Sequence, residues 1–593
     1  MSYSQPSSGL LGDPSRDAYL TDFGKATLSD RYLFTGETYQ DLFVRVAKAY
    51  SDDERHAARL YDYMSKGWFM PATPILSNGG TARGLPISCF LNTVGDSLHG
   101  IDTTWSENIF LAARGGGIGT HWGHVREIGA KVNEVGESSG IIPFIKVQDS
   151  LTLAISQGSL RRGSSAVYLD IDHPEIKEFI NIRKPKGDPN RQCLNIHQGV
   201  VITDEFMLAV KEGKQFPLKS RLTGEIVEHV DARKLFADIL ETRVETGEPY
   251  LLFVDTVNEQ RPDVYKKLGL KVQQSNLCSE IMLHTGPDHL GNERTAVCCL
   301  SSVNAETFEE WEHDENFIED VMRFLDNVLS DFIEKSKADP GFDRARYSAS
   351  RERSVGLGLM GFHSFLQKNM IPFESVMAKV WNKKFFVHLR LGADAASKKL
   401  AQERGPCPDA QDAGLMERFS HKIAVAPTAS ISIICRGVSA GIEPWVANVF
   451  THKTLSGSFT VKNTYLKKIL EEHGQDTHET WVKIIEAKGS VQHLSFLTQE
   501  QKDVFKTAKE LDQRWIIDLA ADRSKLIDQG QSVNIFLPPD VDKAVLLNLH
   551  AMAWSRKVKS LYYTRSEAGI RSENISSAPV AAAVNTDECL ACQ

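Results

Sequence analysis

Apolar, strand-like runs alternate with amphipathic helices along most of the chain. The runs that predict strands are 166–171, 199–203, 250–254, 423–426 and 533–537. Between them, residues 317–333 carry apolar side chains at 318, 321, 322, 325, 328, 329 and 332, which is the spacing of a helix with one buried face. Strands that alternate with helices over hundreds of residues predict an α/β fold with a largely parallel sheet.

Both ends of the chain differ from this pattern. Residues 38–67 predict two helices, and Ser51 with Glu54 has the spacing of a capping box at the start of the second. Residues 68–100 are rich in loop signals. At the other end, residues 572–593 are rich in Ala, Ser and Asn and lack periodicity, so we expect a mobile tail there.

Composition narrows the class of protein. With 41% hydrophobic and 24% charged residues, this 593-residue chain has an ordinary globular composition. Its net charge of -9 offers no basic face, so we expect no nucleic-acid partner. No apolar run reaches the roughly 18 residues that a membrane-spanning helix needs, and the N-terminus lacks a secretory signal pattern. We therefore expect a cytoplasmic protein with no membrane partner.

One cysteine stands between an amide and a carboxylate. Asn276 precedes Cys278 by two residues, and Glu280 follows it by two. In an extended segment these three side chains would project from one face. A lone cysteine is as often a small buried hydrophobe, but burying the flanking polar groups for packing alone would be costly. The segment therefore indicates a site where sulfur acts on a hydroxylated substrate.

The other cysteines leave two interpretations open. Nine cysteines in this length are too few for a disulfide scaffold. Cys589-x-x-Cys592 could be half of a zinc site, but no further ligands lie near it in the sequence. It could instead be an exposed dithiol that exchanges with disulfides, and we favour this interpretation. Cys89 and Cys298 are candidates for the disulfide that such a dithiol would reduce. Their spacing alone is more typical of buried structural thiols.

Five motifs occur in one order. They are Ser-Cys at 88–89, Asn-Leu-Cys-x-Glu at 276–280, Cys-x-Leu-Ser at 298–301, Tyr-Tyr at 562–563 and the terminal Cys-x-x-Cys. Together they resemble the catalytic large (α) subunit of class I ribonucleotide reductase, from about residue 28 to the C-terminus. Supporting stretches lie at 71–74, 95–98, 156–158, 427–430 and 441–444. Each motif is weak alone, whereas the ordered set is specific.

The resemblance implies a fold. The family has a ten-stranded α/β barrel of two five-stranded parallel halves, with a central finger loop that carries the reactive cysteine. We expect a flexible lead-in at 1–20, an N-terminal helical region at 21–85, the barrel at 86–566 and a mobile tail at 567–593. Many large subunits begin with an ATP-binding module, the ATP-cone. The recognisable chain starts near residue 20, so we expect no ATP-cone, and on/off control by ATP and dATP either absent or on the partner subunit.

The resemblance also implies how the central thiol would react. Cys278 would become a thiyl radical and remove the 3′ hydrogen of the ribose. Sulfur suits this step because the S–H bond is close in strength to the activated ribose C–H bond. Glu280 would take the proton of the 3′-hydroxyl, and Asn276 would hold that hydroxyl by hydrogen bonding.

Four further cysteines would carry the reducing electrons. Cys89 would protonate the departing 2′-hydroxyl, and Cys89 with Cys298 would supply two electrons and close a disulfide. Cys589 and Cys592 would reopen that disulfide and be recharged by thioredoxin or glutaredoxin. The family motif favours Cys298 over Cys299, and adjacent residues on a strand face opposite ways, so only one of them can serve.

The radical would come from outside the chain. Tyr562 and Tyr563 are adjacent oxidisable phenols, although such a pair on a strand usually serves packing. The resemblance implies a relay from a separate, metal-containing β subunit through Tyr563 and Tyr562 to Cys278. We expect no cofactor and no metal in this chain itself. The expected partners are this β subunit, a thioredoxin- or glutaredoxin-like reductant, ribonucleoside diphosphates and a second copy of the chain.

Matching positions imply substrate and effector contacts. Residues 427–431, small and hydroxylated after an apolar run, would offer backbone N–H donors to phosphate. The expected substrate-binding residues are Thr73, Ser88, Cys89, Gly117, Asn276, Leu277, Cys278, Ser279, Glu280, Pro427, Thr428, Ala429, Ser430 and Ile431. Asp96 and Arg126 would bind a dNTP or ATP specificity effector. The loop at 156–166 would pass effector identity to the choice of base.

Two other motifs point to different chemistry. Gly356-x-Gly358-x-x-Gly361 fits the dinucleotide fingerprint, but charged residues rather than a buried strand precede it. We expect these glycines to let a helix pack closely. His121-x-x-His124 lacks further ligands at zinc spacing, so packing histidines are expected.

Each alternative function would require different sequence features. An adenosylcobalamin-dependent class II reductase would need no tyrosine relay, and a glycyl-radical class III enzyme would need a C-terminal glycine motif that is missing. A non-catalytic nucleotide-binding regulator would have no use for the intact cysteine set, and a nicotinamide-dependent dehydrogenase rests on the glycine motif alone. A class I ribonucleoside-diphosphate reductase is therefore the function that the sequence favours.

Overall fold

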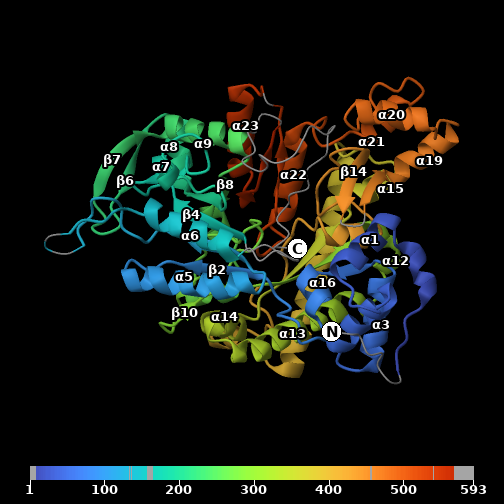
Figure 1. The fold of residues 1–593 in the computed structure, drawn as a ribbon, viewed down its shortest axis with the longest axis horizontal. Helices are drawn as coiled ribbons and strands as arrows, with labels where there is room; N and C mark the ends of the chain where they lie inside the picture. Colours follow the sequence, from blue (N-terminus) through green and yellow to red (C-terminus); the bar gives the residue numbers. More distant parts are fainter. Residues whose placement is uncertain are drawn as a thin grey trace.

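A barrel of two half-sheets surrounded by helices forms the centre of the molecule (Figure 1). A computed structural model describes residues 9–132, 134, 136–155, 164–454, 457–538 and 540–566. None of the helices within these ranges is long and apolar enough to cross a membrane.

The first half of the barrel has five parallel strands. In spatial order they are β2 (Cys89–Thr93), β3 (Gly117–His121), β4 (Ser164–Asp170), β5 (His197–Ile202) and β8 (Tyr250–Phe253). Their side chains are almost all buried, because helices cover the outer face and the finger loop fills the inner one. The predicted strands at 166–171, 199–203 and 250–254 are confirmed.

The second half is more irregular. β12 (Cys299–Asn304) pairs in parallel with β13 (Val355–Met360), and β16 (Ile535–Phe536) pairs in parallel with β18 (Thr564–Arg565). Between these two pairs, residues 423–425 and residue 531 continue the order of strands. They are joined by isolated parallel bridges, from Leu357 to Ile423 and from Val425 to Gln531. The predicted strand at 423–426 is thus extended chain with isolated bridges.

Two short antiparallel pairs close the halves into a barrel. β11 (Ala296–Val297) pairs with β2, and β17 (Ser560–Leu561) pairs with β8. The halves therefore run in opposite directions and meet at two seams. This arrangement confirms the expected ten-stranded α/β barrel of two five-stranded parallel halves.

The glycine motif lies inside this barrel. Gly356 and Gly358 belong to β13, so the expectation that they let a helix pack closely is wrong. A Cβ on Gly358 would lie 2.7 Å from the carbonyl oxygen of Ala424, and one on Gly356 would lie 3.2 Å from the Sγ of Cys298. Gly356 and Gly358 let neighbouring segments and a cysteine approach a barrel strand closely. Gly361, with a φ of 76°, joins β13 to α15.

Helices before the barrel pack on its second half. They are η1 (Pro14–Tyr19), α1 (Asp22–Arg31), α2 (Tyr39–Ala49) and α3 (Glu54–Ser65). Part of the expected flexible lead-in is ordered, since η1 is tied to α3 by the Arg16–Asp62 ion pair at 2.8 Å. The predicted Ser51 cap is wrong, because Asp53 caps α3 by accepting from the His56 N–H at 2.8 Å.

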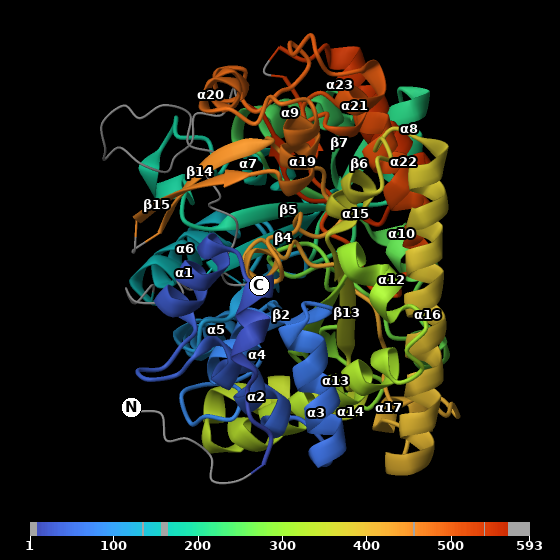
Figure 2. The ribbon, with the colours of Figure 1, turned by 90° about the vertical axis from the view of Figure 1, so that its right-hand side faces the viewer.

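Two long helices cover the outside of the second half. The predicted helix at 317–333 is confirmed as α13 (Phe317–Lys335), whose apolar face is buried. It packs against α3 and against the 29-residue α16 (Val376–Arg404), which runs along the side of the molecule in Figure 2.

The remaining elements connect these parts. Before β11 in the sequence they are β1 (Phe69–Pro71), which pairs with β12, α4 (Thr73–Asn78), α5 (Leu98–Ala113), α6 (Ile142–Ile155), α7 (Ile176–Phe179), η2 (Pro189–Arg191), α8 (Asp204–Glu212), β6 (Gln215–Lys219), β7 (Ile226–Asp231), α9 (Ala232–Thr246), α10 (Val254–Glu259), α11 (Asp263–Leu268), β9 (Gly286–Pro287) and β10 (Glu293–Arg294). After β12 they are η3 (Ala305–Thr307), α12 (Phe308–Trp311), η4 (Ser336–Ala338), η5 (Pro340–Phe342), α14 (Asp343–Glu352), α15 (Phe362–Lys368), α17 (Pro408–Asp412), α18 (Ile431–Ile434), α21 (Gln499–Val504), α22 (Gln513–Ser524) and α23 (Lys543–Ser555). The hairpin β14 (Val449–Thr454) and β15 (Gly457–Lys462), with α19 (Thr464–Glu472) and α20 (His478–Glu486), adds a small second core.

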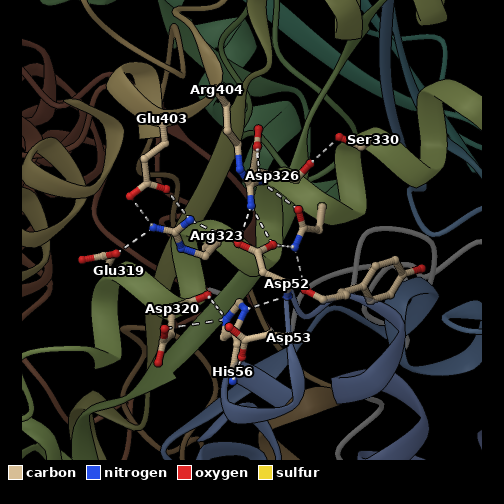
Figure 3. Close-up of polar contacts among 12 residues, drawn as sticks. Asp52, Asp53, His56, Glu319, Asp320, Arg323, Asp326, Ser330, Glu403 and Arg404 are labelled. Carbon is tan, nitrogen blue, oxygen red and sulfur yellow. Dashed lines mark hydrogen bonds and ion pairs between the residues drawn. The ribbon is translucent and has the colours of Figure 1, made fainter. Parts of the chain in front are cut away.

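A buried ion network joins α13, α16 and the N-terminal helices (Figure 3). The carboxylate of Asp326 accepts from Arg353 at 2.7 Å, Arg404 at 2.7 Å and Arg418 at 3.0 Å. Arg404 also reaches Asp52 at 2.5 Å, in the turn between α2 and α3. Burial alone would raise the pKa of Asp326, but the guanidinium groups outweigh burial and hold this pKa below its usual value.

We expect Asp326→Ala to lower the free energy of unfolding by about 3–5 kcal/mol, because it leaves buried guanidinium charge unpaired. Urea titration measures the change. Glu319→Ala is the control, since Glu319 is 24% exposed beside Arg323 and should cost at most about 1 kcal/mol. The wild type should also lose the Asp326 contribution as pH falls below about 4, because a carboxyl with a depressed pKa stabilises only while it is ionised. Equal losses in the two variants would contradict the prediction.

Candidate active site

The central finger loop, residues 271–285, enters the barrel against the first half-sheet. A Cβ on Gly119 of β3 would lie 2.1 Å from the carbonyl oxygen of Ser275, so only glycine allows the loop to pass this strand so closely. From the neighbouring strand β4, the hydroxyl of Tyr168 donates to the carbonyl oxygen of Asn276 at 2.7 Å. The first half-sheet therefore positions the residues just before Cys278.

The second half of the barrel holds the other side of the loop. The hydroxyl of Ser532 donates to the carbonyl oxygen of Cys278 at 2.6 Å. The N–H of Gly530 donates to the carbonyl oxygen of Glu280 at 2.8 Å. Contacts from both halves place Cys278 at the centre of the barrel.

The tip of the loop is a turn. Ser279 has a φ of 65°, and its N–H lies 3.3 Å from the carbonyl oxygen of Asn276. The side-chain oxygen of Asn276 accepts from the N–H groups of Glu280 at 3.0 Å and Ile281 at 3.1 Å. The expectation of an extended segment is therefore wrong, and local hydrogen bonds rather than strand alternation set the arrangement of these residues.

The reactive groups of the loop tip are enclosed. Asn276, Cys278 and Glu280 are all fully buried. Burial raises the pKa of the Tyr168 phenol well above its usual value, and the neighbouring Glu280 and Cys278 raise it further. Tyr168 thus faces the same interior space as the carboxyl and the thiol.

Cys89 and Cys298 are cross-strand neighbours at the seam of the barrel. The antiparallel register pairs Val297 with Phe90 and Ala296 with Leu91, and it continues to Cys298 opposite Cys89. The N–H of Cys298 lies 3.4 Å from the carbonyl oxygen of Cys89. Directly opposite residues have Cβ atoms about 4.5–5.5 Å apart on the same face. A small adjustment brings such a pair into disulfide range.

Gln529 links this cysteine pair to the finger loop. Its side-chain nitrogen lies 3.2 Å from the Sγ of Cys298, and its side-chain oxygen accepts from the N–H of Met282 at 3.2 Å. Burial raises the pKa of Cys298 well above its usual value. The buried thiol therefore stays protonated until a reaction requires its proton or electrons.

Cys299 occupies a different environment. It begins β12 opposite Val355, and burial raises the pKa of its thiol. The nearby Cys89 raises this pKa further, Arg353 lowers it, and Asp326 raises it. Cys298 lies between β11 and β12 with its Sγ beside Gln529, whereas Cys299 lies near Arg353 and Asp326, so the two thiols have different neighbours although both lie near Cys89.

The stretch at 427–431 leads into α18. Thr428 has a φ of 55°, and its hydroxyl accepts from the N–H of Gly441 at 2.7 Å. This bond folds the predicted stretch at 441–444 against 427–431. Thr73 begins α4, and its hydroxyl shares a hydrogen bond with Tyr32 at 2.9 Å. Ser88 and Gly117 lie at the start of the parallel pair β2 and β3, where the N–H of Gly117 donates to the Ser88 carbonyl at 2.7 Å.

The two tyrosines lie beside the finger loop in a cluster of rings. The ring centroids of Tyr562 and Tyr563 are 4.2 Å apart, and that of Tyr250 lies 4.7 Å and 5.1 Å from them. Just upstream, the hydroxyl of Ser560 donates to the carbonyl oxygen of Ser279 at 3.0 Å. The phenols thus follow directly after a contact with the loop tip.

Comparison with known proteins decides the family. The family described as "Ribonucleotide reductase, barrel domain" matches residues 87–417 and 411–564, and "Ribonucleotide reductase, all-alpha domain" matches residues 18–84. The chain belongs to the ribonucleotide reductase large-subunit family. Among solved structures, the Actinobacillus ureae class Id ribonucleotide reductase alpha subunit superposes with a TM-score of 0.82 at 36% identity, covering 94% of this chain and 99% of that one.

Curated relatives agree with this assignment. A Frog virus 3 protein, provisionally named a ribonucleoside-diphosphate reductase large subunit, is 43% identical over 94% of this chain and 96% of its own length. The ribonucleoside-diphosphate reductase large subunit of Invertebrate iridescent virus 3 is 38% identical over 98% and 99%. The match to a class I alpha structure favours a class I over a cobalamin-dependent class II reductase. The chain is a class I ribonucleotide reductase catalytic subunit.

The predicted effector residues of this reductase lie together. Arg126 bonds to the carboxylate of Asp96 through its backbone N–H at 3.0 Å and its guanidinium at 2.8 Å. Both side chains are partly exposed. The pair joins the turn after β2 to the turn after β3. Of the expected specificity loop, residues 156–163 lie outside the described residues, as do Cys589 and Cys592 of the expected tail.

The histidine motif of the reductase contacts polar side chains. His121 lies 3.2 Å from Asp170, and His124 contacts Gln273. Burial lowers the pKa of His124. A second cluster of His289, Asp409 and Asp412 has donor atoms within 4.8 Å of one another. Nearby arginines already neutralise its carboxylates, with Arg294 bonded to Asp409 at 2.6 Å and Arg351 bonded to Asp412.

Several residues around the site carried no sequence signal. Tyr168, Gln529 and Ser532 each contact the finger loop or the cysteine pair. They are polar residues in two segments, with Tyr168 in β4 and the other two at 529–532, and no motif or spacing marks them. Only the closure of the barrel brings them to the site.

Proposed function

We propose that Cys278 is the thiyl-radical position at which this subunit reduces ribonucleoside diphosphates. Its place at the tip of the finger loop supports this role, because the barrel shields a reactive radical from water. The thiyl radical would take the 3′ hydrogen of the ribose, forming an S–H bond and leaving a carbon radical. The hydrogen returns to that carbon after reduction, which regenerates the radical.

Glu280 and Asn276 would handle the 3′-hydroxyl. The carboxylate of Glu280 accepts its proton as the 2′-hydroxyl departs, and general base catalysis of this kind is worth about 10²–10⁴-fold. The side chain of Asn276 already holds the turn through its oxygen, so its NH₂ group would serve the substrate. One side chain would thereby fix both the loop tip and the ribose.

Cys89 and Cys298 would supply the electrons. Cys89 protonates the leaving 2′-hydroxyl, which departs as water, and the two thiols become one disulfide as the nucleotide is reduced. The single observation that carries this proposal is the backbone contact from the Cys298 N–H to the Cys89 carbonyl oxygen, beside the antiparallel pairing of β11 and β2. Cys589 and Cys592 would then reduce the disulfide and pass the oxidation to thioredoxin or glutaredoxin.

We expect Cys298→Ser to abolish steady-state turnover with dithiol reductants, while Cys299→Ser keeps turnover within about threefold. The reason is that the backbone of Cys298 bonds to that of Cys89 and its Sγ contacts Gln529, which also bonds to the finger loop. The neighbouring Cys299→Ser variant controls for loss of a buried sulfur. Turnover assays with one ribonucleoside diphosphate measure both. Full activity in Cys298→Ser would contradict the assignment.

The remaining roles concern partners. A metal-containing β subunit would take one electron from Tyr563. Tyr563 would then oxidise Tyr562, and Tyr562 would oxidise Cys278. Residues 427–431 and Thr73 would hold the diphosphate, and a dNTP or ATP at Asp96 and Arg126 would select the base in a homodimer. Repeated thiol reduction suits the cytoplasm, where reductants keep thiols reduced.

One assay tests the proposed function as a whole. Reduction of all four ribonucleoside diphosphates is measured with and without the β subunit and with each dNTP effector. We expect turnover only with β, and a base preference that changes with the effector. Turnover of the chain alone with adenosylcobalamin would instead indicate a class II enzyme.

A further inference from the structure

The neighbours of Gln529 fix the orientation of its side-chain amide. The amide oxygen lies 3.2 Å from the N–H of Met282 in the finger loop, and the amide nitrogen lies 3.1 Å from the carbonyl oxygen of Val355 in β13. A backbone N–H can only donate and a carbonyl can only accept, so the two contacts exclude the flipped amide. The NH₂ group therefore points toward β13.

The sulfur of Cys298 lies within reach of the same NH₂ group. Its Sγ is 3.2 Å from the amide nitrogen of Gln529. The hydroxyl of Ser354 lies 3.4 Å from that nitrogen and 3.9 Å from the sulfur. An NH₂ group has two hydrogens, enough for the carbonyl of Val355 and for the sulfur. Burial raises the pKa of the Cys298 thiol, and the hydrogen bond from Gln529 acts in the opposite direction.

Backbone contacts hold Gln529 in place. Its N–H donates to the carbonyl oxygen of Ile423 at 3.1 Å, and its carbonyl oxygen accepts from Nζ of Lys559 at 2.6 Å. The residue is fully buried. A donor that is fixed in this way need not reorganise when negative charge develops on the atom it faces, so it stabilises that charge more effectively than mobile water would.

The other cysteine of the pair has no such donor. Cys89 is buried, and among the residues that the structure describes none makes a hydrogen bond to its Sγ. When a disulfide is cleaved by a thiolate, the sulfur that leaves keeps the electron pair, and exchange is faster when that sulfur forms the more stable thiolate. In a disulfide between the two residues, Cys298 is therefore the better leaving group.

We propose that Gln529 stabilises the thiolate of Cys298 when the Cys89–Cys298 disulfide is reduced, so that the incoming thiol reductant bonds to Cys89. The inference rests on the proposed role of this pair as the electron donor. It gives the two cysteines different parts in the exchange, and it assigns a chemical function to the amide beside them.

The exchange proceeds in two steps. A thiolate of the reductant attacks Sγ of Cys89, an S–S bond forms between them, the bond to Cys298 breaks, and the electron pair stays on Sγ of Cys298. A second thiolate of the reductant then attacks the reductant sulfur in this mixed disulfide and releases Cys89 as a thiolate. Each cysteine takes one proton from water, and the reductant is left as a disulfide.

Trapping the first step tests the proposal. The Cys589→Ser, Cys592→Ser chain is taken through one turnover with β, a ribonucleoside diphosphate and its effector, which forms the disulfide. It is then treated briefly with the monothiol mercaptoethanol and quenched with N-ethylmaleimide. We expect peptide mass spectrometry to find mercaptoethanol on Cys89 and maleimide on Cys298 at least about ten times as often as the reverse.

A variant separates the effect of the amide from access to the sulfurs. Gln529→Glu keeps an oxygen for the N–H of Met282, but it replaces the NH₂ group, with its two hydrogens, by an oxygen with at most one. It should slow the reduction by mercaptoethanol by about 10–100-fold and remove the preference for Cys89.

Gln531→Glu is the matched control. Gln531 is also buried, and its side chain donates to the carbonyl oxygen of Ala520 at 2.8 Å and accepts from Arg523 at 2.5 Å. The variant likewise exchanges an NH₂ group that faces a carbonyl for an oxygen, but away from the cysteine pair. It should keep the rate and the preference of the unsubstituted position.

Two results would overturn the proposal. Mercaptoethanol found mainly on Cys298 is the first, and it requires no substitution at position 529. The second is a preference for Cys89 that Gln529→Glu leaves unchanged, because access alone would then explain the direction of attack. A chain that makes deoxynucleotide without any Cys89–Cys298 disulfide would instead overturn the proposed electron donors.

Discussion

Cys278→Ser should abolish nucleotide reduction while the protein still binds its substrate and effectors. Serine keeps the size of the side chain and the turn at the loop tip, but an O–H bond is too strong for a phenoxyl radical to break. The loss should be on the order of 10⁴–10⁶-fold, as expected when the group that performs the chemistry is removed. Steady-state turnover with β and equilibrium binding of a ribonucleoside diphosphate measure the two properties.

A matched control separates chemistry from loss of a buried thiol. Cys435 is also fully buried, and its Sγ lies 3.3 Å from the carbonyl oxygen of Gly67, away from the finger loop. Cys435→Ser should keep most of the activity. Turnover by Cys278→Ser within tenfold of the wild type would show that another group starts the reaction.

Tyr562→Phe should block the reaction by a different route. The ring that packs 4.7 Å from Tyr250 and 4.2 Å from Tyr563 is retained, so folding should be unaffected. Phenylalanine has no phenol that can be oxidised with loss of a proton, so the radical cannot reach Cys278. We expect turnover to fall by at least about 10³-fold, while binding of β, substrate and effector stays intact.

The control is a buried tyrosine in the N-terminal helices. The hydroxyl of Tyr61 donates to Gln40 at 2.8 Å and accepts from the Asp13 N–H at 2.6 Å. Tyr61→Phe therefore loses two hydrogen bonds, at a cost of about 1–3 kcal/mol in stability and none in turnover. Substantial activity in Tyr562→Phe would mean that the radical reaches the finger loop without this phenol.

Sequence pattern predicted the fold better than it predicted local geometry. Hydrophobic periodicity identified α13 and the barrel strands β4, β5 and β8, because burial on one or both faces leaves a period in the chain. It could not distinguish the glycines of β13 from a helix-packing motif. Their close neighbours, Ala424 and Cys298, come from other segments, and no local pattern records such proximity.

The active site shows the same contrast between what the sequence predicts and what only the folded structure reveals. Cys278 stood out through its immediate neighbours, but the proposed strand alternation was wrong because Asn276 turns the chain through side-chain hydrogen bonds. The pairing of Cys89 with Cys298 depends on register across a seam between residues more than two hundred positions apart. Gln529 contacts Cys298 from a segment distant in sequence, so only the folded structure reveals it.

The central claim is that three sulfurs meet at one ribose. It is tested by mapping disulfides after turnover without external reductant, in a Cys589→Ser, Cys592→Ser variant supplied with β, a ribonucleoside diphosphate and its effector. The account predicts one deoxynucleotide per active site and an equal amount of the Cys89–Cys298 disulfide by peptide mass spectrometry. Product formed while both cysteines stay reduced, or a disulfide from Cys89 to Cys299, would contradict it.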